Sequence, residues 1–154
     1  MFGVRSLAIA FGCITACTIV GNEGAPSPAT TLNETVFRCR VEPILARQCS
    51  FNACHGNPGS PLRIYTPGKL RAATPANIDD AIAALTEAEQ HANFVSAAGF
   101  NFGLTSVDDN WLLRKPLPAR EGGYEHKGGA IYTGGSDPQY VAIRLWLTGM
   151  GTCP

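Results

Sequence analysis

The amino-acid sequence predicts a mainly α-helical protein in which short helices are joined by long loops rich in Gly and Pro. Segments that alternate apolar and polar residues, as strands do, are nearly absent, whereas several short segments carry apolar residues at helical spacing. The 154 residues include 17 Gly and 11 Pro, which favour loops. Hydrophobic residues make up 45% of the chain, enough to bury a core, and the length allows one domain of ordinary size.

The charges of the chain are balanced. The chain has twelve basic and twelve acidic residues, so its net charge is zero when His is neutral. This balance argues against a basic surface that binds nucleic acid and against a strongly charged disordered chain. We therefore expect no nucleic-acid partner.

The first 16 residues have the pattern of an export signal. Arg5 precedes an apolar run, residues 7–14, that is too short to span a bilayer as a permanent helix. The run ends in Ile-Thr-Ala-Cys17, which resembles a bacterial lipobox, where cleavage falls just before the Cys and its thiol is lipidated. Residues 17–32 are small and polar and contain Gly and Pro, as flexible tethers do. The alternatives are ordinary cleavage elsewhere or an uncleaved N-terminal anchor.

These segments predict an exported protein that is lipid-anchored to a bacterial membrane at Cys17. The folded domain, residues 33–154, would then lie in the periplasm or at the cell surface. Several acyl chains on one residue anchor a protein firmly. Four cysteines remain in this domain, in a compartment that permits disulfides: Cys39, Cys49, Cys54 and Cys153.

Two helices are expected in the first half of the domain. Pro43 is a natural first-turn residue, and it lies among residues that share one helical face, namely Val41, Ile44, Leu45 and Gln48. Residues 77–97 are rich in Ala and predict one long helix, with an apolar side formed by Ile78, Ile82 and Leu85.

Two more helices are expected in the second half. Residues 108–110 (Asp-Asp-Asn) cap a short helix that carries residues 111–113 (Trp-Leu-Leu) and that Pro116 ends. Residues 136–138 (Ser-Asp-Pro) are a strong helix start, and Gly149 is a good stop signal. The apolar stripe of this last helix consists of Tyr140, Ile143 and Leu147.

The first helix leads into Cys49-Ser-Phe-Asn-Ala-Cys54-His55-Gly56. A Cys, a short spacer and then Cys-His is the attachment signature of c-type haem. In that chemistry the two thiols form thioethers with the porphyrin vinyl groups, and the adjacent imidazole is the proximal iron ligand. The spacer here is four residues instead of the usual two. A longer loop can still bring both sulfurs to the vinyl groups.

Two other interpretations of these residues stay open. The loop can close as a Cys49–Cys54 disulfide, with His55 as an ordinary loop residue. A zinc site can be drawn from Cys39, Cys49, Cys54 and His55, although structural zinc usually has two paired ligand knuckles and the second is missing here.

The segments around this run resemble the planctomycete-type cytochrome c family. VEPILARQCSFNACHG followed by LRIYT is similar to that family's proline-led helix, its Cys-Cys-His run and its short Leu-Arg segment. WLLRKPL, HKGG and DPQYVAIRLWLTGM are similar to its Leu-Leu-Lys-Pro segment, its His-x-Gly-Gly motif and its final helix. The resemblance covers residues 37–151. It implies a small cytochrome c-like domain whose short helices and long loops surround one covalent haem c with its iron.

The second axial ligand of such a haem has two candidates. His126 lies in a loop so rich in Gly that its backbone can approach a flat ring, and the resemblance also points to this His. Met is the other common distal ligand, and Met150, in the turn after the last helix, is the alternative. The remaining His91 lies in a predicted helix beside polar residues, which is typical of a solvated side chain.

If haem occupies Cys49 and Cys54, then Cys39 and Cys153 are the natural disulfide partners. Such a bond would fasten the end of the domain to its first helix. The alternative is two free thiols, which an oxidising compartment disfavours.

The sequence offers no catalytic motif. It contains no G-x-S-x-G, no H-E-x-x-H and no phosphate-cradling loop. We therefore expect an electron carrier and not an enzyme, with redox proteins of the cell envelope as partners and the membrane reached through the lipid anchor. The alternative is a haemless, disulfide-stabilised binding module of the envelope.

Overall fold

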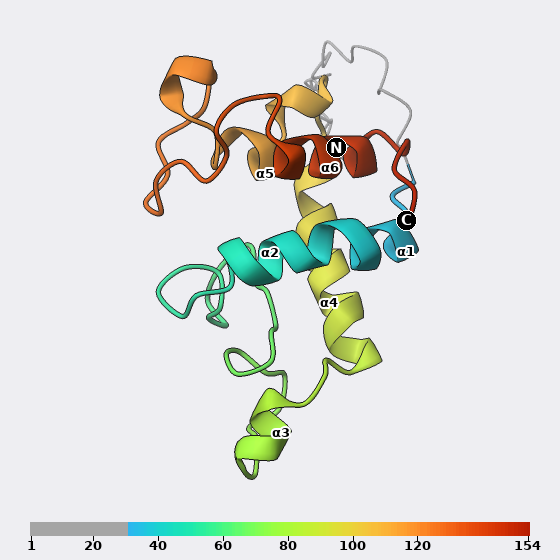
Figure 1. Ribbon diagram of the computed structural model, residues 1–154, viewed down its shortest axis with the longest axis vertical. Helices are drawn as coiled ribbons and strands as arrows, with labels where there is room; N and C mark the ends of the chain where they lie inside the picture. The colour runs from blue at the N-terminus through green and yellow to red at the C-terminus, as the bar shows by residue number, and fades with distance from the viewer. Residues whose placement is uncertain (1–30) are drawn as a thin grey trace, which may run out of the picture.

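The computed structural model describes residues 31–154 (Figure 1). The predicted signal, the lipidation site Cys17 and the tether up to residue 30 lie outside these residues. The described part is built from helices and loops and has no strand, so the prediction of a mainly α protein is confirmed. Its helices are α1 (Glu34–Val36), η1 (Phe37–Val41), α2 (Glu42–Gln48), α3 (Ile78–Ile82), α4 (Glu87–Ala98), η2 (Gly99–Asn101), η3 (Val107–Asp109), α5 (Trp111–Arg114), η4 (Ala119–Glu121) and α6 (Pro138–Leu147).

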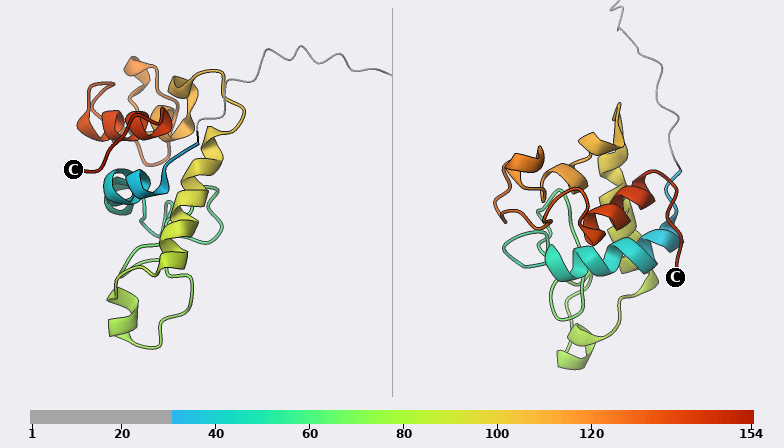
Figure 2. Two further views of the ribbon diagram at one scale, coloured as in Figure 1. Left: turned by 90° about the vertical axis from the view of Figure 1, so that its right-hand side faces the viewer. Right: turned by 45° about the horizontal axis from the view of Figure 1, so that its top comes forward.

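The helices α1, η1 and α2 follow one another without a gap and form one rod. α6 lies alongside this rod and α4 crosses it (Figures 1 and 2). None of the described helices is long and apolar enough to cross a membrane.

An aromatic cluster joins these three elements. The Phe37 ring is fully buried, and its centroid lies 5.7 Å from that of Phe94 on α4 and 5.2 Å from that of Trp146 on α6. Buried aromatic pairs add about 0.5–1.5 kcal/mol beyond the area they bury. The indole nitrogen of Trp146 also donates a hydrogen bond of 3.0 Å to the carbonyl of Asn33. Asn33 in turn caps α1 by accepting from the Val36 amide, so the rod's start and the last helix are held together.

The prediction of one helix over residues 77–97 is wrong. The helix ends at Ile82, because Ala83 leaves the helical region, and a second helix begins after Thr86. Thr86 and Glu89 form a capping box, in which each side chain bonds the backbone of the other. The predicted apolar face is not buried, since Ile78 is 71% exposed and Ile82 56%.

Arg71, in the loop before α3, binds both sides of this break. Its guanidinium donates to the carbonyls of Asp80, Ala81 and Ala83, which lie at the end of α3. It also forms a buried ion pair with Glu89, at 2.9 Å from Nε to Oε1. The hydrogen bond from Arg71 holds the pKa of Glu89 at about 2. The end of α3 and the start of α4 are therefore held by one side chain from the loop that precedes α3.

The two C-terminal helices begin where their caps predict. The Asn110 side chain accepts from the Leu112 amide at 2.9 Å and starts α5. Asp137 accepts from the Gln139 amide at 2.9 Å, and Pro138 occupies the first turn of α6. The predicted stripe of α6 is buried: it consists of Tyr140, Ile143 and Leu147.

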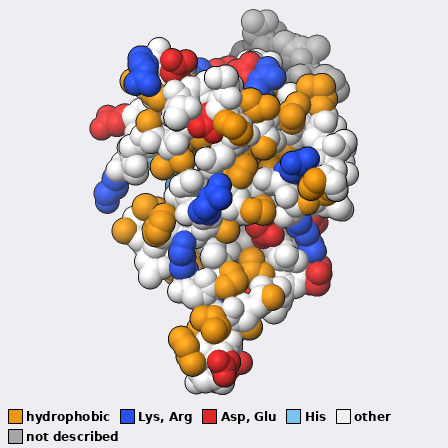
Figure 3. All heavy atoms as spheres, in the orientation of Figure 1, with side chains coloured by type: hydrophobic (Ala, Val, Ile, Leu, Met, Phe, Trp, Pro, Cys, Tyr) orange, Lys and Arg blue, Asp and Glu red, His pale blue; other side chains and the backbone are white. Residues whose placement is uncertain are grey.

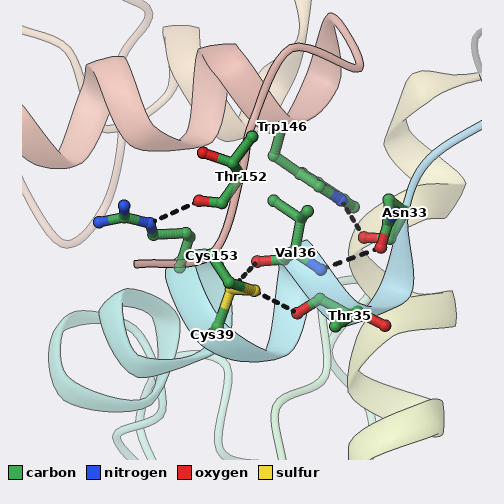
Figure 4. Close-up of a disulfide and its surroundings, with 8 residues drawn as sticks. Asn33, Thr35, Val36, Cys39, Trp146, Thr152 and Cys153 are labelled. Carbon is green, nitrogen blue, oxygen red and sulfur yellow. Dashed lines mark hydrogen bonds between the residues drawn. A yellow bond between two sulfur atoms is a disulfide. The ribbon is translucent and has the colours of Figure 1, made fainter.

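Cys39 and Cys153, the pair expected to bond, form a disulfide in the structure (Figure 4). Their Cα atoms lie 5.8 Å apart, across a sequence separation of 114 residues. The bond ties the segment after α6 to η1. Next to it, Arg40 Nε donates to the carbonyl of Thr152 at 2.9 Å, so the last residues are also held by a hydrogen bond.

Removing this disulfide should weaken the fold strongly. For a closed loop of this length, the chain-entropy model assigns about 4–5 kcal/mol to the bond. We expect the Cys39→Ser/Cys153→Ser variant to lose a large part of that free energy of unfolding, measured by urea denaturation. Reduction of the wild type should lower its stability to that of the variant. Equal stability of the variant and the oxidised wild type would contradict this role.

Candidate functional site

One cavity of about 230 Å³ lies between the C-terminal end of α2, helix α5 and the loop that follows η4. In Figure 1 the loops after α2 and after η4 both lie at the left of the molecule. Both His55 and His126 line this cavity, together with Cys49. Its wall is otherwise mostly apolar and includes Leu45, Leu62, Phe100, Trp111, Leu112 and Tyr132. Such walls exclude water from whatever group binds between the two histidines.

The helix α2 delivers Cys49 to the cavity. α2 ends at Gln48, and Cys49 is its buried C-terminal cap. A tight turn follows, in which the carbonyl of Phe51 accepts from the amides of both Cys54 (2.8 Å) and Gly56 (2.9 Å). The His55 amide donates back to the Cys49 carbonyl at 3.1 Å. The four-residue spacer is thus folded into one compact turn.

Both cysteines of this turn carry free thiols. Cys49 is buried and Cys54 is exposed, and the two sulfurs are not bonded to each other. Burial, together with the neighbouring Cys54, raises the pKa of Cys49 to about 11, so its thiol is protonated at neutral pH. The alternative of a Cys49–Cys54 disulfide is not the arrangement in this structure.

The ring of His55 is fixed by acceptors on one side. Its Nδ1 lies 3.0 Å from the carbonyl of Leu62 and 2.9 Å from Oγ of Ser60. Because a carbonyl can only accept, Nδ1 carries the hydrogen, and Nε2 keeps a free lone pair. Burial lowers the pKa of His55, and the nearby His126 acts in the same direction, so the ring is neutral at neutral pH. A neutral imidazole with one nitrogen anchored in this way is the usual form of a metal-ligating His.

The ring of His126 is fixed in the same manner. Its Nδ1 donates to the carbonyl of Gly129 at 2.9 Å, which leaves Nε2 free. The loop around it is attached to the end of α5: the Tyr124 amide donates to the Arg114 carbonyl at 2.9 Å, and the Ile131 amide donates to that of Pro116 at 2.8 Å. Gly129 has a φ of 74°, a left-handed conformation that Gly adopts without strain.

The two imidazole rings lie nearly parallel to each other on the wall of the same cavity. Their planes differ by only 10°, and their centroids are 6.1 Å apart. This separation is too large for contact between stacked ring faces, whose atoms meet at about 3.5–4 Å. A metal ion at about 2 Å from one nitrogen of each ring would separate the centroids by about 6 Å. The centroid spacing therefore matches that of two imidazoles that ligate one metal ion.

The other candidate ligands lie elsewhere. Met150 is 62% exposed, follows α6 and does not line the cavity. His91 is exposed on α4, and its Nδ1 lies 3.0 Å from Oε2 of Glu34. Cys39, one of the four residues of the zinc alternative, is held in the disulfide with Cys153.

Several residues of the site carry no signal that sequence patterns detect. Ser60 and Leu62 orient His55 through a hydroxyl and a backbone carbonyl, and such acceptors leave no motif. Phe100 and Tyr132 form cavity wall in the folded chain, and from the sequence they are ordinary core residues. The Tyr132 hydroxyl donates to the carbonyl of Leu112 at 3.2 Å, which satisfies it inside the wall. Only the fold brings these residues to the cavity.

The glycine after His55 is required by close backbone packing. A Cβ atom at Gly56 would overlap the carbonyl oxygen of Ser50. We expect Gly56→Ala to destabilise the domain by about 1–3 kcal/mol, because backbone must move to make room. The matched control is Gly59→Ala, since a Cβ there meets only the Asn57 side chain at 3.5 Å. Urea denaturation of both variants checks this; equal stabilities would show that the turn after Cys49 is not packed as described.

Comparison of the chain with models of protein families, with curated proteins and with solved structures found no match. What this cavity binds must therefore be inferred from its own residues. Those residues include the thiol of Cys49, two imidazoles with free Nε2 atoms and a mostly apolar wall.

Proposed function

We propose that this protein is an exported, lipid-anchored electron carrier whose domain binds one haem c covalently. It would be similar to the planctomycete-type cytochrome c family. The observation that carries the proposal is the pair His55 and His126: nearly parallel rings, 6.1 Å apart, on the same cavity as Cys49. A disulfide loop or a surface loop gives no reason for that pairing.

Four side chains would hold the cofactor. Cys49 and Cys54 supply the thiols for two thioether bonds, and the turn between them keeps both free of a mutual disulfide. His55 would be the proximal ligand and His126 the distal one, since each keeps its Nε2 free. When bound, a haem iron exchanges one electron between its ferric and ferrous states.

The remaining residues orient and shield the site. The Leu62 and Gly129 carbonyls accept the Nδ1 hydrogens, which fixes the tautomer of each ligand and increases its basicity. The apolar wall, with Leu45, Phe100 and Tyr132, keeps water from the ring faces. Because protein side chains would fill both axial positions, no place is left for a substrate on the iron. This favours electron transfer over catalysis.

Partners and location follow from the N-terminal segment. A lipid at Cys17 and a tether up to residue 32 would attach the domain to a bacterial membrane, in the periplasm or at the cell surface, where it would exchange electrons with redox proteins of the envelope. On the face drawn in Figure 3, basic and acidic side chains are spread among hydrophobic ones. The balanced charge of the whole chain argues against a nucleic-acid partner.

A haemless binding module remains the second candidate function. The observation that favours it is the combination of an apolar cavity with the Cys39–Cys153 disulfide, which stabilises the domain without any cofactor. In that case the cavity would take a small apolar ligand.

A redox titration of the purified protein, expressed with haem-attachment machinery, tests electron transfer. We expect a reversible one-electron transition, at a potential below that of a His/Met site, since a thioether ligand raises the potential. The reduced protein should bind carbon monoxide slowly or not at all. Fast binding of carbon monoxide would show an open iron position and argue for ligand sensing or catalysis.

A further inference from the structure

Three residues with charged side chains line the cavity. The wall contains Lys115, just after α5, and Glu125 and Lys127, on either side of His126. Lys115 Nζ donates to the backbone carbonyl of Glu125 at 3.0 Å, so these chain segments are joined. These three residues are the charged part of a mostly apolar cavity wall, and we call them its mouth.

Both ammonium groups of this mouth are available to a ligand. Lys115 is half-buried, and its Nζ lies 5.4 Å from the centroid of the Trp111 ring, which holds the side chain in place. Within residues 31–154, neither Lys115 nor Lys127 forms an ion pair, and the Glu125 carboxylate forms none either. An ammonium has three hydrogens to donate, and Lys115 uses one.

The cation near Cys49 is Lys69, and its ammonium already has hydrogen-bond partners. Lys69 acts on the Cys49 thiol, lowering its pKa against the larger effect of burial. Its ammonium is already engaged by Ser50 Oγ (2.9 Å), the Ala46 carbonyl (3.3 Å) and the Phe51 ring (4.2 Å). Lys69 is not part of the cavity wall. Lys69, near Cys49, thus caps α2, whereas Lys115 and Lys127 at the mouth keep unused hydrogen-bond donors.

We propose that Lys115 and Lys127 bind the two propionate carboxylates of the haem. The vinyl groups and the propionates lie on opposite edges of the porphyrin, so the ring would enter with its vinyl edge toward Cys49 and Cys54 and its propionate edge at the 115–127 mouth. This assignment rests on the proposed function. Charge-assisted hydrogen bonds between ammonium and carboxylate are among the strongest that side chains make.

Glu125 places a negative charge in the same mouth as the two lysines. It holds Lys115 through its backbone oxygen and not through its carboxylate, so its negative charge does not neutralise either ammonium directly. The Glu125→Gln variant should make the mouth more positive and raise the midpoint potential. Lysine removal should lower the potential, because a positive charge near the iron favours its reduced state.

The test compares two double variants of the haem-loaded protein. Lys115→Gln/Lys127→Gln removes two charges at the mouth, and Arg47→Gln/Arg120→Gln removes two charges at exposed residues outside the cavity wall. We expect the lysine pair to lower the midpoint potential and to shift the propionate bands of the resonance Raman spectrum, while the iron stays low-spin. The Arg47→Gln/Arg120→Gln variant should keep a midpoint potential and propionate bands close to those of the wild type. Lys115→Arg/Lys127→Arg, which keeps the charges, should restore the potential.

Three results would overturn the assignment. Unchanged potential and unchanged propionate bands in the lysine variant would show that the propionates lie elsewhere. An equal shift in the arginine variant would show a general effect of net charge. If the double variant does not fold, each single lysine variant must show a smaller shift in the same direction, and its absence counts against the assignment. A wild type without covalent haem would instead overturn the proposed function itself.

Discussion

Replacement of both Cys49 and Cys54 by Ala should remove every covalent bond to the haem, so that acidified acetone extracts all of it from the protein. In the wild type the extraction should leave the haem on the polypeptide, because thioether bonds survive acid. The structure supports this expectation, since both thiols are free and Cys49 lies on the cavity that His55 and His126 share. Haem staining of the denatured protein after electrophoresis measures the result.

The matched control removes the other two cysteines of the domain. Cys39→Ala/Cys153→Ala takes away the same number of sulfurs, and those sulfurs belong to the disulfide outside the cavity wall. This variant should keep its covalent haem although its fold is weaker. Haem that resists extraction in the Cys49/Cys54 variant, or loss of haem in the control, would show that the attachment site is wrongly assigned.

Replacement of His126 by Ala should convert the iron from low-spin to high-spin. The side chain is the one imidazole that faces His55, at 6.1 Å between centroids, and its loss leaves one axial position to water or to nothing. Optical and electron paramagnetic resonance spectra of the oxidised protein report the spin state directly.

Two variants control for the other candidate ligands. Met150→Leu should stay low-spin, because Met150 is exposed and lies outside the cavity wall. His91→Ala should also stay low-spin, since His91 lies on α4 beside Glu34. If Met150→Leu is the variant that loses its low-spin spectrum, then His126 is only a loop residue and Met150 is the distal ligand.

Local chemistry is enough to predict several helix ends of this fold. Asn110 and Asp137 cap their helices through bonds to amides two residues ahead, and Pro138 needs no amide partner in the first turn. These interactions involve only neighbours in the sequence. The same holds for α2, whose first turn contains Pro43, whereas the π-helix η1 before it was not predicted.

The break between α3 and α4 shows where local reasoning fails. The Ala-rich composition of residues 77–97 favours one helix, and only the Thr86 and Glu89 pair hints at a second start. The break is fixed by Arg71, which binds both the last carbonyls of α3 and the carboxylate of Glu89. Side-chain bonds from a residue outside the segment therefore accompany a break that the segment's own helix propensity does not predict.

The candidate site also contains residues that local sequence predicts and residues that only the fold brings together. Cys49, Cys54 and His55 lie within one turn, so their spacing alone suggests shared chemistry. His126 is 71 residues away from His55, and its position depends on backbone bonds from its loop to Arg114 and Pro116. Those bonds have no sequence signature, and His126 was predicted only from its Gly-rich loop and from the resemblance to a family. The cavity wall and the lysines at its mouth became visible only in the folded chain.

The absorption spectrum of the wild-type protein, expressed with haem-attachment machinery and recorded before and after extraction with acidified acetone, tests the central claim most directly. The account predicts a red protein that keeps its haem through extraction and shows the low-spin spectrum of two imidazole ligands. A colourless protein in which Cys49 and Cys54 are joined in a disulfide would contradict it and support the haemless binding module.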